Sequence, residues 1–158
     1  MENISLSDIH LTFGGGGTAE EGANRNVPPY AGEYFMLGPM PAYGLYARGV
    51  KGLTVQNVRL QTASADLRPA VIFDHVTDAA ISSLSIEANA NAESAMRLTD
   101  SQQVLFTAVR LLSPTAVFLA VEGSANERIV IDGGDISQAA KPVTFKDPAS
   151  RQSVKLRN

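Results

Sequence analysis

Residues 52–60 read GLTVQNVRL, with apolar side chains at the second, fourth, seventh and ninth positions. The same spacing recurs in NISLSDIHL (3–11), DAAISSLSI (78–86), QVLFTAVRL (103–111) and RIVIDGGDI (128–136). Measured at its second apolar position, the pattern repeats after Val55 in steps of 26, 25, 25 and 25 residues, and the last step reaches Leu156. Apolar and polar residues alternate on both sides of a two-residue break in the pattern, between its fourth and seventh positions. This alternation indicates two short strands joined at a kink rather than a helix.

A further apolar strand precedes each later copy of this pattern. These strands read GLYARGV, AVIFDHV, SAMRLTD, AVFLAVE and PVTFKDP. A unit of such short strands cannot bury its apolar side alone, but it can by stacking on a copy of itself, with parallel strands about 4.8 Å apart. We therefore predict one all-β domain over residues 1–158, a right-handed parallel β-helix of about six coils. Its register places Arg48 beside Asp74 on the next coil.

A long insertion interrupts the repeat. The step from Leu6 to Val55 is 49 residues, about two periods, and residues 14–42 (GGGGTAEEGANRNVPPYAGEYFMLGPMPA) fill the excess. The glycines let the chain leave the coil through positive φ angles, whereas a phosphate loop would need G-K-[ST] after them. Connections longer than about 12–15 residues are usually functional or disordered. We expect this loop to lie between coils one and two.

Composition excludes several classes of function. A net charge of −3 and a pI of 5.3 give no electrostatic footprint for nucleic acid or an anionic membrane. No apolar run approaches the roughly 20 residues that span a bilayer, and MENISLSD lacks the apolar core of an export signal. Without cysteine, disulfides and thiolate metal sites are excluded, and only His10 and His75 could supply imidazole. We expect no cofactor, metal, nucleic-acid or membrane partner.

Three segments carry a resemblance to a known family. NISLSDIHLTFGGGG, PAYGLYARGVKGLTVQNVRL and RPAVIFDHV resemble the C-terminal part of glycoside hydrolase family 28, the polygalacturonase and rhamnogalacturonase-like enzymes. The resemblance implies a parallel β-helix, a pectin-type substrate containing galacturonic acid, inverting hydrolysis by aspartates, and a secreted or periplasmic location. The family's catalytic motifs are N-x-D, D-D, G-H-G and R-I-K, and none of them occurs here. No catalytic residue is therefore predicted.

The insertion supplies the candidate substrate-binding residues, because aromatic faces stack on sugar rings and charged groups contact acidic sugars. They are Glu20, Glu21, Arg25, Tyr30, Glu33, Tyr34 and Tyr43. The alternative is that Tyr34 and its neighbours form an extra strand or pack the loop against the coil. Asp78 and Asp100 fall near kinks, where aspartate commonly caps turns.

The sequence leaves three functions open. The first is an inactive C-terminal piece of a family 28-like protein that binds acidic polysaccharide. The second is an active glycoside hydrolase that combines the loop glutamates with outward aspartates such as Asp74, at the roughly 6.5–9.5 Å carboxyl spacing of inverting enzymes. The third is a purely structural, self-assembling solenoid.

The first coil predicts self-association. Ile4 and Leu6 point inward there, and the strand that carries them has an unpaired edge. We expect a homo-oligomer through this coil, or a loop 14–42 that folds back as a plug.

Overall fold

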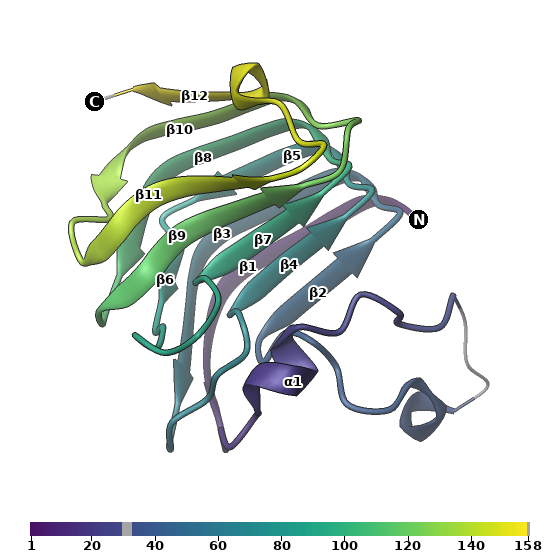
Figure 1. The fold of residues 1–158 in the computed structure, drawn as a ribbon, viewed down its shortest axis with the longest axis vertical. Coiled ribbons are helices and arrows are strands. Elements are labelled where there is room, and N and C mark those ends of the chain that lie inside the picture. Colours follow the sequence, from purple (N-terminus) through teal and green to yellow (C-terminus); the bar gives the residue numbers. More distant parts are fainter. Residues whose placement is uncertain (30–32, 158) are drawn as a thin grey trace.

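The computed structural model describes residues 1–29 and 33–157, and its strands form two parallel sheets (Figure 1). Sheet A contains, in order, β1 (Glu2–Phe13), β3 (Lys51–Thr62), β5 (Thr77–Ser82), β8 (Gln102–Leu111), β10 (Glu127–Asp135) and β12 (Val154–Arg157), with β6 (Ser85–Ile86) between β3 and β8. Sheet B contains β2 (Leu45–Arg48), β4 (Val71–Asp74), β7 (Met96–Thr99), β9 (Thr115–Glu122) and β11 (Ala139–Lys146).

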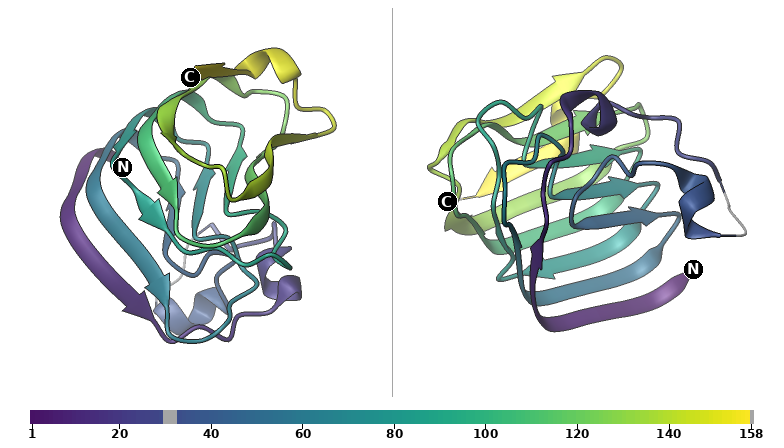
Figure 2. Two further views of the ribbon diagram at one scale, coloured as in Figure 1. Left: turned by 90° about the vertical axis from the view of Figure 1, so that its left-hand side faces the viewer. Right: turned by 90° about the horizontal axis from the view of Figure 1, so that it is seen from below.

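Each turn runs through one strand of sheet B, a short corner and one row of sheet A. The rows stack in chain order, from purple to yellow in Figure 2. The predicted parallel β-helix is confirmed. Sheet A has six rows and sheet B has five, so the first of the six predicted coils consists, within the described residues, of β1 alone, without a strand of sheet B beside it.

The predicted register is also confirmed. Leu6, Val55, Ile81, Phe106, Ile131 and Leu156 form one inward column through consecutive rows. The middle of the core is aromatic, since the ring of Phe106 lies 6.4 Å from that of Phe73 and 6.5 Å from that of Phe118. All three phenylalanines are fully buried. Stacked equivalent positions therefore build the core, as the repeat requires.

The corners repeat as well, in three rows of left-handed backbone. They contain all ten non-glycine residues with positive φ in the described chain, together with four glycines. The rows are Gly49, His75, Asp100 and Gly123; Asn3, Gly52, Asp78, Gln103 and Arg128; and Asp8, Asn57, Ser83, Ala108 and Gly133. Asp100 Oδ1 accepts a hydrogen bond from Ala125 N at 2.8 Å, so its carboxylate links its corner to the next coil instead of capping its own turn.

Ala108 is a poor fit to its corner. Its φ is 53°, a conformation that costs most L-residues about 1–2 kcal/mol and that asparagine tolerates best. Because the side chain is exposed, we expect Ala108→Asn to raise the free energy of unfolding by about 0.5–1 kcal/mol in urea titrations. Ala80→Asn, at an exposed position on strand β5 outside the three rows, is the matched control and should not stabilise. Equal effects of the two changes would contradict this account.

The predicted insertion lies between β1 and β2. It contains α1 (Ala19–Gly22) and the 3₁₀ helix η1 (Tyr34–Leu37). Asp66 holds the base of the loop, since its carboxylate accepts from Gly17 N at 3.1 Å and pairs with Arg68, whose Nη1 donates to Met40 O. None of the helices described is long and apolar enough to cross a membrane.

Candidate functional site

The outer face of sheet B lies under the insertion. Its outward positions form two columns, Tyr46, Ile72, Arg97, Ala120 and Thr144 in the first and Arg48, Asp74, Thr99, Glu122 and Lys146 in the second. Outward residues of a solenoid normally face water, yet Ile72 is 1% exposed and Arg97 is 2% exposed. Both are covered because the loop folds back over this face.

Arginine donors on the coil hold the loop by its backbone carbonyls. Arg97 Nη1 donates to Gly22 O at 2.7 Å, and Arg97 Nη2 donates to Asn24 O at 3.2 Å. Arg48 Nη1 donates to Val27 O at 2.8 Å. Hydrogen bonds from charged donors are stronger than neutral ones, so these contacts fix the loop over sheet B.

A network of charged side chains closes one end of this site. Arg25, from the loop, contacts Glu93 at 2.6 Å and donates from Nε to Glu122 at 3.1 Å. Burial alone would raise the pKa of Glu122, but the hydrogen bonds and charge of Arg25 outweigh it, so the pKa is lowered. Burial lowers the pKa of the Arg97 guanidinium, and the charge of Arg25 lowers it further. Arg97 Nε has no hydrogen-bond partner among the described residues.

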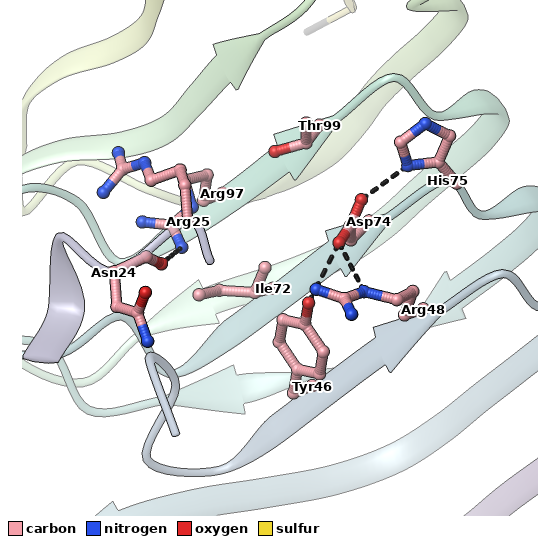
Figure 3. Close-up of a pocket in the computed structure, with 9 residues that line it drawn as sticks. All are labelled: Asn24, Arg25, Tyr46, Arg48, Ile72, Asp74, His75, Arg97 and Thr99. Carbon is pink, nitrogen blue, oxygen red and sulfur yellow. Dashed lines mark hydrogen bonds and ion pairs between the residues drawn. The ribbon is translucent and has the colours of Figure 1, made fainter. Parts of the chain in front are cut away.

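Asp74 is the centre of the opposite end (Figure 3). Its carboxylate accepts from Tyr46 Oη at 2.9 Å and from Arg48 Nε at 2.7 Å, and His75 Nδ1 lies 2.6 Å away. The predicted pairing of Arg48 with Asp74 is thus confirmed. Burial would raise the pKa of Asp74, but the three hydrogen bonds outweigh it and lower the pKa. Burial and the hydrogen bond to Asp74 raise the pKa of Tyr46 to about 12, so the phenol stays neutral.

A cavity of about 420 Å³ lies between the two ends. It is lined by Asn24, Arg25, Tyr46, Arg48, Ile72, Asp74, His75, Arg97 and Thr99 (Figure 3). Asn24 Nδ2 and Thr99 Oγ1 make no hydrogen bond to the described residues, and Arg48 Nη2, next to the Tyr46 hydroxyl, donates to no carboxylate or carbonyl among them. Nδ2 and Nη2 are donors, and a hydroxyl can donate. The cavity therefore offers open donors to a ligand that is rich in acceptors.

Of the predicted binding residues, Arg25 lines this cavity. Glu20 and Glu33 are exposed elsewhere on the loop, and Glu21 caps α1 by accepting from Thr18 N at 2.9 Å. Tyr43 belongs to the core, since it is 6% exposed and its hydroxyl donates to Glu87 O at 2.6 Å. Its ring is thus not available to stack on a sugar.

The two remaining predictions concern tyrosines of the loop. Tyr30 lies outside the described residues, and Tyr34 begins η1 rather than an extra strand. Sequence reasoning missed Tyr46, Arg97 and Thr99. They occupy outward positions of predicted strands, and a long loop beside those positions was the signal that could have identified them.

Comparisons with known proteins give no relative. No family model matches the chain, and neither the curated proteins nor the solved structures contain a significant match. The described residues also hold no group of three histidine or carboxylate side chains arranged for a metal ion. The functional argument therefore starts from the cavity itself.

Proposed function

We propose that the chain is a family 28-like β-helix that binds an acidic, pectin-type polysaccharide on the outer face of sheet B without hydrolysing it. The observation that carries this proposal is the set of open donors in the cavity, from Asn24, Arg48 and Thr99. Sugar carboxylates accept hydrogen bonds without donating any, and sugar hydroxyls and ring oxygens also accept. Tyr46 adds apolar surface against which a sugar ring can pack.

The net charge of the cavity contributes little to a preference for acidic sugars. Arg25 and Arg97 are balanced by Glu93 and Glu122, and Arg48 is balanced by Asp74. Selection of an acidic sugar therefore depends on donor geometry, above all at Arg48, whose Nη2 donates to no carboxylate or carbonyl of the described residues. We expect a modest salt dependence, because the charges lie in close pairs that cancel at a distance.

The separation and the pKa values of the carboxylates beside the cavity argue for sugar binding rather than hydrolysis. Asp74 and Glu122 occupy one outward column two strands apart, a backbone separation of about 10 Å. Inverting hydrolysis also needs one carboxyl group that stays protonated through a raised pKa. The pKa values of both groups are lowered, so both are ionised at neutral pH. Neither can act as the general acid.

Arg48→Gln tests the proposal. We expect the dissociation constant for a galacturonate oligomer, measured by calorimetry, to rise by about tenfold or more, because a charge-assisted hydrogen bond contributes about 1.5–3 kcal/mol. Arg59→Gln, on the outer face of β3, is the matched control and should bind as the parent does. A neutral galactan oligomer of the same length should bind more weakly.

Two outcomes would contradict the proposal. Equal affinity of the Arg48 and Arg59 variants would show that the cavity does not hold the sugar. Release of new reducing ends by the parent chain would establish a hydrolase instead, with Glu20, Glu21 and Glu33 as the first carboxylates to replace.

A further inference from the structure

The side chains that line the cavity on the outer face of sheet B become more exposed toward one end. Along β4, Ile72 is 1% exposed, the side chain of Asp74 is 18% exposed, and that of His75, at the corner that follows, is 65% exposed. Arg97 is 2% exposed. In Figure 3, Arg25 and Arg97 lie together at one end of the cavity and His75 lies at the other. The cavity therefore has a deep end beside Arg97 and a mouth beside His75.

Ion pairs close the deep end. Arg25 bridges two carboxylates there, since its guanidinium lies 2.6 Å from Glu93 and its Nε donates to Glu122 at 3.1 Å. The side chain of Glu122 is 9% exposed, and Lys146 Nζ lies 3.8 Å from it on the side away from β7. A polymer that continued past this end would break these pairs and leave a buried carboxylate without its counter-charge, which is costly.

The insertion forms a wall along one side of the same cavity. Arg97 Nη2 donates to Asn24 O at 3.2 Å, and Arg48 Nη1 donates to Pro28 O at 3.1 Å. Residues 24–28 are thus tied to β7 at one point and to β2 at the other. Among the described residues, the cavity is bounded by this wall, by sheet B beneath it and by the ion pairs at its deep end, and it opens toward His75.

We propose that the cavity receives the end of an acidic polysaccharide chain, with one terminal galacturonate in the deep part and the rest of the chain leaving past His75. This inference rests on the proposed saccharide function and names the part of the polymer that is bound. A site for the interior of a chain must let the chain pass at both ends, whereas a site with one closed end admits a terminus. The volume of about 420 Å³ lies in the lower part of the roughly 300–1,000 Å³ range of small-ligand sites, which suits a terminal residue.

The polar groups along this path match such a ligand. A terminal sugar has a free hydroxyl where an internal one is linked, and Asn24 Nδ2, toward the deep end, can donate to it. At the mouth, His75 Nδ1 lies 2.6 Å from Asp74 Oδ1, which places the proton of the neutral ring on Nδ1. His75 Nε2 can then accept from a hydroxyl of the second sugar, since its nearest charged neighbour, Asp100 Oδ2, is 4.0 Å away.

Calorimetry of the 158-residue chain with galacturonate oligomers of three and twelve residues tests this inference. We expect one protein molecule per oligosaccharide chain at both lengths, with similar dissociation constants. Both ends of a chain carry a terminal galacturonate, and a three-residue oligomer reduced to an open alditol at its reducing end distinguishes them. Affinity that is kept assigns the non-reducing end and affinity that is lost assigns the reducing end, with one protein molecule per chain in either case.

His75→Gly tests the position of the mouth. Gly49 and Gly123 occupy the same left-handed corner in other rows, so glycine fits the backbone there. The dissociation constant for the three-residue oligomer should rise about threefold or more, as expected for the loss of one hydrogen bond. The dissociation constant for galacturonic acid itself should not change, because a single sugar in the deep part does not extend to the mouth.

These measurements separate failure of end recognition from failure of saccharide binding. Two or more protein molecules on one twelve-residue chain would overturn end recognition and leave the proposed function in place. Equal effects of His75→Gly on both sugars would do the same. Absence of binding to every sugar tested would overturn the proposed function and this inference together.

Discussion

Phe106→Ala is expected to lower the free energy of unfolding by about 3–5 kcal/mol, a large share of the stability of a domain this size. The side chain is fully buried and lies between the rings of Phe73 and Phe118, at centroid distances of 6.4 and 6.5 Å. Strands in a solenoid are held at a fixed spacing by their neighbours on both sides, so the walls of the resulting cavity cannot collapse. The cost should therefore fall near the upper end of the range for such substitutions.

Urea unfolding followed by circular dichroism measures this effect. Leu105→Ala is the matched control, because Leu105 precedes Phe106 on β8 but points outward and is 41% exposed. It should change the stability by no more than about 0.5 kcal/mol. A loss of under 1 kcal/mol for Phe106→Ala, with an unchanged dependence on urea, would mean that this core is not packed as described.

The fold could be predicted from the sequence because a solenoid repeats its requirements. Each inward column needs an apolar residue at the same offset in every turn, and the offset appears directly in the spacing of Val55, Ile81 and Phe106. The same register predicts the pairing of Arg48 with Asp74. The left-handed backbone at the corners could not be predicted as readily, since Gln103 and Arg128 adopt left-handed conformations that their residue types do not favour.

The cavity on the outer face of sheet B could not be predicted in the same way. In SAMRLTD, Arg97 occupies an outward position that faces water in an isolated coil. It is buried because its guanidinium meets carbonyls of Gly22 and Asn24, more than 70 residues earlier in the chain. Tyr43 shows the opposite case, as a loop residue that joins the core by donating to Glu87 O. Contacts between a loop and a distant face follow no period, so residue spacing carries no signal for them.

Asp66→Asn should also lower the free energy of unfolding strongly, because Asp66 holds the base of the insertion between β1 and β2. Its side chain is 1% exposed and accepts hydrogen bonds from Gly17 N, Arg68 N and two guanidinium nitrogens of Arg68. An amide cannot accept at both ends, and it leaves Arg68 without its counter-charge. Removing one partner of a buried pair costs about 3–5 kcal/mol, and we expect a loss of about 3 kcal/mol at pH 7, because Arg68 is partly exposed.

The pH dependence of this loss identifies its cause. Burial would raise the pKa of Asp66, but the hydrogen bonds from Arg68 and Gly17 outweigh it, so the folded-state pKa lies below the usual value near 4. The stabilisation is then fully present above pH 5 and is lost as the pH falls below 4 through the folded-state pKa. We therefore compare the free energies of unfolding of parent and variant by urea unfolding at pH 7, 5 and 3. The difference between them should be the same at pH 7 and pH 5 and smaller at pH 3.

Asp132→Asn provides the matched control, since Asp132 is 44% exposed and lies 3.8 Å from Arg157. It should cost under about 0.5 kcal/mol and leave sugar binding unchanged. Asp66 does not line the cavity on the outer face of sheet B, but it holds both ends of the loop. Its carboxylate accepts from Gly17 N near one end, and its partner Arg68 donates to Met40 O near the other. Asp66→Asn should therefore also weaken binding of the galacturonate oligomer. Binding that survives the substitution intact would mean that Asn24 and Arg25 keep their places without the base of the loop, held by Arg97, Glu93 and Glu122 alone.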